Sequence, residues 1–123
     1  FEERAISILA YNLETVLAEK LETLLARGTA NTRMRDYYDI YVLTNTREHN
    51  IDNAILKEAF VNTSEKRGSI GLLSDVHLIL REVAESTVLL DRWKNYQRKF
   101  DYAVEVLWAD VMESVSCLVD IVK

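Results

Sequence analysis

The amino-acid sequence predicts an all-α protein, a bundle of about five helices in a single domain. The 123 residues include no proline and only three glycines, so few positions interrupt a helix. Apolar residues make up 49% of the chain and recur at three- and four-residue steps over long stretches. A chain of this length buries one hydrophobic core, and we expect residues 1–123 to form one domain.

The first helix is expected over residues 13–27. Its apolar side follows the helical period and consists of Leu13, Val16, Leu17, Leu21, Leu24 and Leu25. Gly28 stands in the position of a C-terminal cap, and the polar connector after it leads into a second helix over about residues 33–44. The two helices are therefore expected to be neighbours. Residues 1–11 leave three alternatives open: a sheet strand, a helix or a frayed end.

The third helix is expected to begin after Asp52, which is placed to cap it. Its expected buried side is Ile55, Leu56, Ala59 and Phe60, with Val61 beside them. Its end, at residues 66–69, is the basic turn KRGS. Such a turn can contact phosphate, but positive charge also suits the C-terminal end of a helix by itself, and we interpret it as a helix end.

The remaining residues predict a long apolar stretch from about residue 73, broken at Ser86, and a last helix over about residues 102–122. The expected stripe of the last helix is Val104, Leu107, Trp108, Val111, Met112, Val115, Leu118, Val119 and Val122. Cys117 lies in this helix, where we expect a buried structural thiol. Aromatic and basic residues alternate over 93–99, as in a nucleic-acid surface, but the spacing of the aromatics favours the core.

Composition excludes several classes of protein. The net charge of −5 argues against broad coating of nucleic acid, which needs many bases. No window is long and apolar enough for a membrane span, no signal peptide is evident, and we expect a cytoplasmic protein. His49, His77 and Cys117 are isolated from one another in sequence, so we predict no zinc site and no tightly bound metal.

Lys20 is the residue that departs most from the pattern. It falls between Leu17 and Leu24 on the apolar side of the first helix, whereas Glu14, Glu19 and Glu22 are expected on its flanks or outer side. A buried, unpaired ammonium is costly. Lys20 is therefore expected to extend to the rim, to pair with a carboxylate, or to line a cleft that receives an anion.

Charged residues gather around the turn between the first two helices, and they are Lys20, Arg27, Arg33, Arg35, Asp36 and Asp39. Two intrahelical ion pairs, Arg33 with Asp36 and Arg35 with Asp39, would explain part of this cluster. The whole cluster also suits a nucleotide-binding rim, because bases bind phosphate and acids bind hard cations.

These residues resemble a known family. The segments LETVLAEKL (13–21), RG (27–28) and RMRDYYDIY (33–41) are similar to the third and fourth motifs of the abortive-infection nucleotidyltransferase toxins of the AbiEii/AbiGii type. The resemblance implies a DNA-polymerase-β-like enzyme of a bacterial toxin-antitoxin system. It further implies a nucleoside triphosphate with Mg²⁺, a cognate antitoxin, and an acceptor such as RNA.

The resemblance also implies roles for individual residues. Lys20 corresponds to the lysine that contacts the nucleotide phosphates, Asp36 to the aspartate needed for activity, and Asp39 to the second acid. Arg27, Arg33 and Arg35 would form a basic edge for the nucleotide or for RNA.

One part of the family pattern is missing. The resemblance implies a catalytic lobe with a Gly-Ser loop and an Asp-x-Asp pair, but the chain contains no Asp-x-Asp. Its only Gly-Ser, at Gly68, lies between helical segments. We therefore expect a C-terminal part of a longer enzyme, inactive alone, with residues 1–11 as a remnant of the catalytic lobe. The alternative is a non-catalytic interaction module that binds an antitoxin or a second copy, in which Lys20 only pairs with Asp36 or Asp39.

Overall fold

The computed structural model describes residues 13–46 and 50–123, so the expectations for residues 1–11 lie outside the described part. The helices are α2 (Leu13–Arg27), α3 (Met34–Asn45), α4 (Asn53–Arg67), α5 (Val76–Glu85), α6 (Thr87–Lys99) and α7 (Trp108–Val122). Short 3-10 turns form η1 (Gly28–Ala30), η2 (Ile70–Asp75) and η3 (Asp101–Ala103). Over these residues the chain has no strand, and the predicted all-α class is confirmed.

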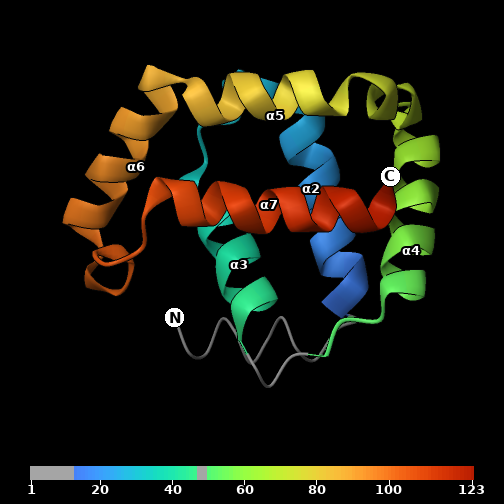
Figure 1. Ribbon diagram of the computed structural model, residues 1–123, viewed down its shortest axis with the longest axis horizontal. Coiled ribbons are helices and arrows are strands. Elements are labelled where there is room, and N and C mark those ends of the chain that lie inside the picture. Colours follow the sequence, from blue (N-terminus) through green and yellow to red (C-terminus); the bar gives the residue numbers. More distant parts are fainter. Residues whose placement is uncertain (1–12, 47–49) are drawn as a thin grey trace.

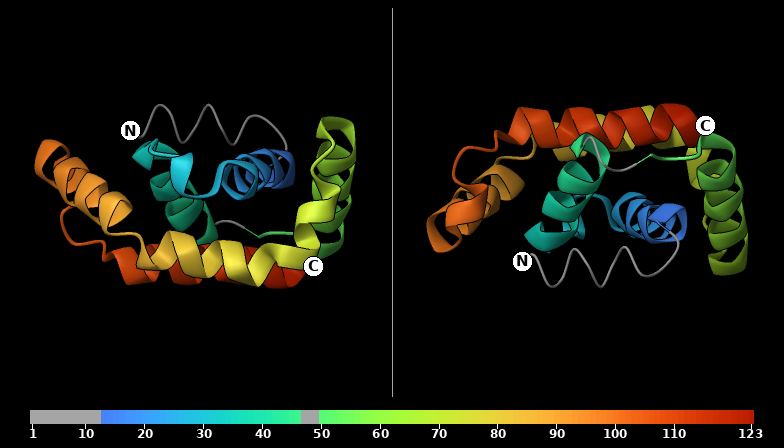
Figure 2. Two further views of the ribbon diagram at one scale, coloured as in Figure 1. Left: turned by 90° about the horizontal axis from the view of Figure 1, so that it is seen from above. Right: turned by 90° about the horizontal axis from the view of Figure 1, so that it is seen from below.

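The helices form two layers that are closed at both ends. In Figure 1, α5 and α7 run side by side in one layer, and α2 and α3 cross behind them. Figure 2 shows the two layers edge-on, with α4 at one end and α6 at the other. Packing contacts join α2 to α3 and α4, and they join α3 and α4 to α7. A single core therefore lies between the layers, and α2 contacts both α3 and α4.

Local sequence signals mark the ends of α2 and α4 and the starts of α4 and α6. Gly28 and Gly68 follow α2 and α4 with φ of 53° and 74°, a left-handed conformation that glycine adopts without strain. The Asp52 side chain caps α4 by accepting hydrogen bonds from the backbone N–H groups of Ala54 and Ile55. Ser86 caps α6 in the same way at Leu89, so the predicted break is confirmed.

The last helix begins later than predicted, because α7 starts at Trp108 rather than near residue 102. The Trp93 indole N–H donates to the Val106 carbonyl at 2.9 Å, and the Gln97 amide donates to the same oxygen at 2.8 Å. These side chains hold the Val106 carbonyl outside a helical ladder. Val104 and Leu107, expected in the core, are 54% and 63% exposed.

Two further burial expectations are wrong. Cys117 is exposed, because it lies more than about a third of a turn from the centre of the buried face of α7, whose apolar members are Trp108, Val111, Met112, Val115, Leu118, Val119 and Val122. Ile55 is 43% exposed, since only Leu56, Phe60 and Ser64 of α4 are buried. On α4 the packed face is narrower than the run of apolar residues suggests, whereas on α7 every member of the expected stripe from Trp108 onward is buried.

Aromatic rings fill the contact between α3, α6 and α7, which confirms the core interpretation of Trp93. Trp93 is 1% exposed, and its ring centre lies 5.9 Å from that of Trp108. The ring of Trp108 also contacts the ring of Tyr37, and the two ring centres lie 5.1 Å apart. The Tyr37 hydroxyl donates a hydrogen bond to the Asn31 carbonyl. No helix of the described part is long and apolar enough to cross a membrane.

Removal of a core side chain should destabilise the fold. Leu24 is completely buried, and Leu24→Ala is expected to lower the free energy of unfolding by about 2–5 kcal/mol. Leu78, which is 54% exposed on α5, provides the matched control, and Leu78→Ala should change it by less than about 0.5 kcal/mol. Urea unfolding measures both, and equal losses would contradict the assigned burial.

Alkaline pH should also destabilise the fold. Burial raises the pKa of the Tyr37 hydroxyl, and the Asp36 carboxylate raises it further. Burial likewise raises the pKa of Tyr38. In the unfolded chain a tyrosine has a pKa of about 10, whereas these two tyrosines ionise only at higher pH in the folded chain. The folded state therefore has its full stability below about pH 10 and loses stability as the pH rises above that value.

Urea unfolding at a series of pH values above 9 tests this expectation. Tyr37→Phe removes one of the groups concerned, so the variant should lose less stability than the wild type over the same pH range. Parallel curves for the two proteins would contradict the prediction.

Candidate functional site

A cleft of about 410 Å³ runs along α2 between α3 and α4. Four of its residues, Val16, Lys20, Thr23 and Arg27, recur at three- and four-residue steps and therefore lie along one side of α2. The remaining lining residues are Glu19 from α2, Arg33 and Asp36 from the start of α3, and Arg67 from the end of α4. The cleft thus has α2 as its floor and the two neighbouring helices as its walls, with four cations and two carboxylates among its lining residues.

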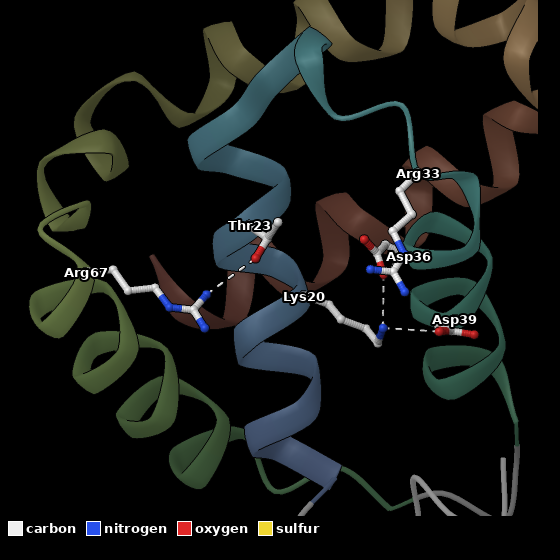
Figure 3. A network of polar contacts seen from close by, with 6 residues as sticks. All are labelled: Lys20, Thr23, Arg33, Asp36, Asp39 and Arg67. Atoms are coloured by element: carbon white, nitrogen blue, oxygen red, sulfur yellow. Dashed lines mark hydrogen bonds and ion pairs between the residues drawn. The ribbon is translucent and has the colours of Figure 1, made fainter. Parts of the chain in front are cut away.

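Lys20 crosses from α2 to α3 and contacts two carboxylates. Its Nζ lies 3.1 Å from Oδ1 of Asp36 and 3.1 Å from Oδ2 of Asp39. Figure 3 shows the ammonium between the two acids. The side chains are 17%, 11% and 1% exposed for Lys20, Asp36 and Asp39, so the group is nearly excluded from water. Of the alternatives for Lys20, pairing is confirmed, and the same residue also lines the cleft.

The first turn of α3 brings two of the predicted residues to the cleft. Arg33 Nε lies 3.9 Å from Asp36 Oδ1, which confirms the predicted contact three residues apart. Arg35 is not among the lining residues of the cleft; its guanidinium contacts the Tyr96 hydroxyl and lowers the Tyr96 pKa, against the larger raising effect of burial. The ion pair between Arg35 and Asp39 remains a prediction.

A second acid-base contact, missed in the sequence, lies on the opposite wall. Glu22, expected on a flank or on the outer side of the helix, is only 4% exposed because α4 covers that side of α2. Its Oε1 accepts a hydrogen bond from Arg67 Nη1 at 2.6 Å, and its Oε2 accepts one from the Ser69 hydroxyl at 2.8 Å. The only signal in the sequence is the basic turn at the end of α4, which identifies neither partner.

The Gly-Ser pair has a structural role in this part of the chain. Gly68 ends α4, and the Ser69 hydroxyl bonds Glu22. His77, farther along, lies with its Nε2 2.8 Å from Lys123 Nζ. These contacts agree with the interpretation that the pair is not a nucleotide loop.

The carboxylates of α3 beside the cleft are engaged by a cation of the protein itself. The described residues include no group of three or more His, Cys, Asp or Glu side chains that could hold a metal. Asp36 and Asp39 instead share the ammonium of Lys20. Their donor set, two oxygens directed at a cation of the protein itself, suits an internal ion pair rather than the oxygen shell of Mg²⁺.

Comparison with protein-family models identifies a family that matches most of the chain. The model described as nucleotidyl transferase AbiEii toxin of type IV toxin-antitoxin systems matches residues 1–114. The chain belongs to the AbiEii family. Comparisons with curated proteins and with solved structures find no match. Membership confirms the resemblance, and it implies a nucleotidyltransferase toxin family that generally uses nucleoside triphosphates and metal ions and that is paired with a cognate antitoxin.

Removal of the lysine from this cluster should destabilise the protein. Lys20→Met leaves two neighbouring, nearly buried carboxylates without their shared cation, and we expect a loss of about 3 kcal/mol in the free energy of unfolding at neutral pH. The double variant Lys20→Met/Asp39→Asn should lose less than the sum of the single changes, because the two residues interact directly.

Lys57→Met is the matched control, because Lys57 is exposed on α4. It should change stability by less than about 0.5 kcal/mol. Thermal or urea unfolding of the wild type, Lys20→Met, Asp39→Asn, the double variant and Lys57→Met measures the effects. Additive losses in the double variant would contradict the assigned contact between Lys20 and Asp39.

Proposed function

We propose that the cleft along α2 binds the phosphate groups of a nucleoside triphosphate, and that this chain thereby contributes to nucleotide transfer to an acceptor such as RNA. The observation that carries the proposal is the position of Lys20. Its ammonium lies at the wall of an open cleft, although its side chain is only 17% exposed and two carboxylates hold it. Proteins rarely keep a lysine in such surroundings without a ligand or a structural partner to favour its charge.

Two arginines add positive charge to the same cleft. Arg27 continues the stripe of Lys20 by two turns, and Arg33 extends from the start of α3. A guanidinium presents five N–H donors and binds phosphate oxygens in pairs. Arg27 and Arg33 would therefore hold the outer phosphate oxygens, while Lys20 would stabilise the charge that shifts along the triphosphate during transfer.

The contacts of Asp36 favour a role in positioning the Lys20 ammonium over a role as a general base. Its Oδ1 already accepts a hydrogen bond from Lys20 and lies near Arg33. Together with Asp39 it fixes the ammonium at one place on the wall of the cleft. Such pre-positioned donors avoid reorganisation when charge develops in the transition state.

The chain supplies only part of the chemistry in this proposal. Neither an Asp-x-Asp pair in the sequence nor a metal-holding group in the described part is present. The acids that hold magnesium during transfer would come from a catalytic lobe, so the chain alone should be inactive.

Label transfer by the full protein tests this function. Labelled nucleoside triphosphates, magnesium and total RNA are incubated with the wild type, Lys20→Ala and Asp36→Ala. Both variants should incorporate at least about 100-fold less label. Lys20→Ala removes the donor that stabilises the developing charge, and Asp36→Ala removes the carboxylate that positions this donor. Lys57→Ala and Asp120→Ala, exposed residues on α4 and α7, are the matched controls and should keep full activity.

Circular dichroism at the assay temperature is needed to check that each variant remains folded. Normal transfer by folded Lys20→Ala would contradict the assigned role. If no nucleotide is incorporated by the wild type, a non-catalytic module that binds an antitoxin or a second copy becomes the better account.

A further inference from the structure

We infer that Arg67 is a further phosphate-binding residue, on the α4 wall of the cleft, and that Glu22 is its positioning residue. The inference rests on the proposed function and extends it to a residue outside the motifs that led to Lys20 and Asp36. It assigns the cleft an elongated ligand with several phosphate groups, which would contact both walls.

The position of Arg67 opposite α3 is the first step of the argument. Arg33 and Arg67 both line the cleft, one from each wall, with the α2 residues Lys20 and Thr23 between them. Figure 3 shows Arg67 extending from α4 towards Thr23 while Lys20 extends towards α3. A single phosphate at Lys20 would not need a cation from α4, whereas a chain of phosphates along the cleft has anionic oxygens near each wall.

The hydrogen bonds of Arg67 leave part of its guanidinium available. Nη1 donates to Glu22 Oε1 at 2.6 Å and reaches Thr23 Oγ1 at 3.4 Å. Its Nε and Nη2 make no hydrogen bond to the described residues, and the side chain is 45% exposed. One edge of the guanidinium is therefore fixed by the protein, and the other can bind two oxygens of a phosphate.

The burial of Glu22 explains why this arginine is held in place. The Glu22 side chain is 5% exposed, and both of its oxygens accept hydrogen bonds, from Arg67 and from Ser69. Two donors attach the carboxylate to both sides of the Gly68 turn. Arg67 therefore does not behave as an ordinary cation at a helix end, whose side chain samples many rotamers in solvent.

Binding of inorganic tripolyphosphate to the chain, followed by NMR titration or calorimetry, tests the inference. Arg67→Gln should weaken binding about tenfold, as expected for the loss of a charge-assisted hydrogen bond. Arg33→Gln should weaken it similarly. Arg92→Gln is the matched control, because Arg92 is exposed on α6, at the opposite end of the molecule from α4, and affinity should be unchanged.

A double-variant cycle separates positioning from a merely structural role. Glu22→Gln should weaken binding severalfold in the wild-type background but have no effect in the Arg67→Gln background, because the effect passes through Arg67. A structural role alone would lower the unfolding temperature and would affect binding equally in both backgrounds, which would overturn the positioning role.

The outcomes distinguish this inference from the proposed function. Wild-type affinity in Arg67→Gln, with weaker binding in Arg33→Gln, overturns the role of Arg67 and leaves the cleft assignment intact. Absence of tripolyphosphate binding by the wild type overturns both. Weaker binding in both arginine variants, with the control unchanged, supports a ligand that spans the two walls.

Discussion

The contact of Lys20 with Asp36 and Asp39 is the interaction on which the candidate site depends. The lysine belongs to α2 and both acids belong to α3, so the contact holds the two helices in one register. The Asp39 side chain is 1% exposed, and a carboxylate removed from water to that degree needs a cation or several donors. Because α3 is fixed in this way, Arg33 is held at the rim of the cleft.

A second buried acid performs the corresponding task on the other side of α2. Glu22 binds the end of α4 through Arg67 and Ser69. Thus α2 is attached to each of its two neighbours by a buried carboxylate and a basic side chain, and the cleft lies between these attachments. The helices that form the floor and walls of the cleft are part of the single core, which gives the cations a rigid support.

The predictions that succeeded depend on short-range physics. Gly28 and Asp52 act within one turn of a helix, so their effects on the backbone follow from neighbouring residues alone. Lys20 was recognised because a charge within an apolar stripe is costly wherever that stripe packs. Asp36 and Asp39 lie within one turn of each other, so their proximity was also a local matter.

The predictions that failed depend on which helix covers which face. Glu22 is buried because α4 packs on its side of α2, and Cys117 is exposed because it lies away from the face of α7 that packs on the core. The sequence by itself determined the all-α class, the helix ends at Gly28, Asp52 and Ser86, and Lys20 as an inward-facing charge, since each follows from residues along one helix. The tertiary structure alone decided that Arg67 joins the cleft and that Arg35 does not, because residues 45 positions apart meet only when whole helices pack.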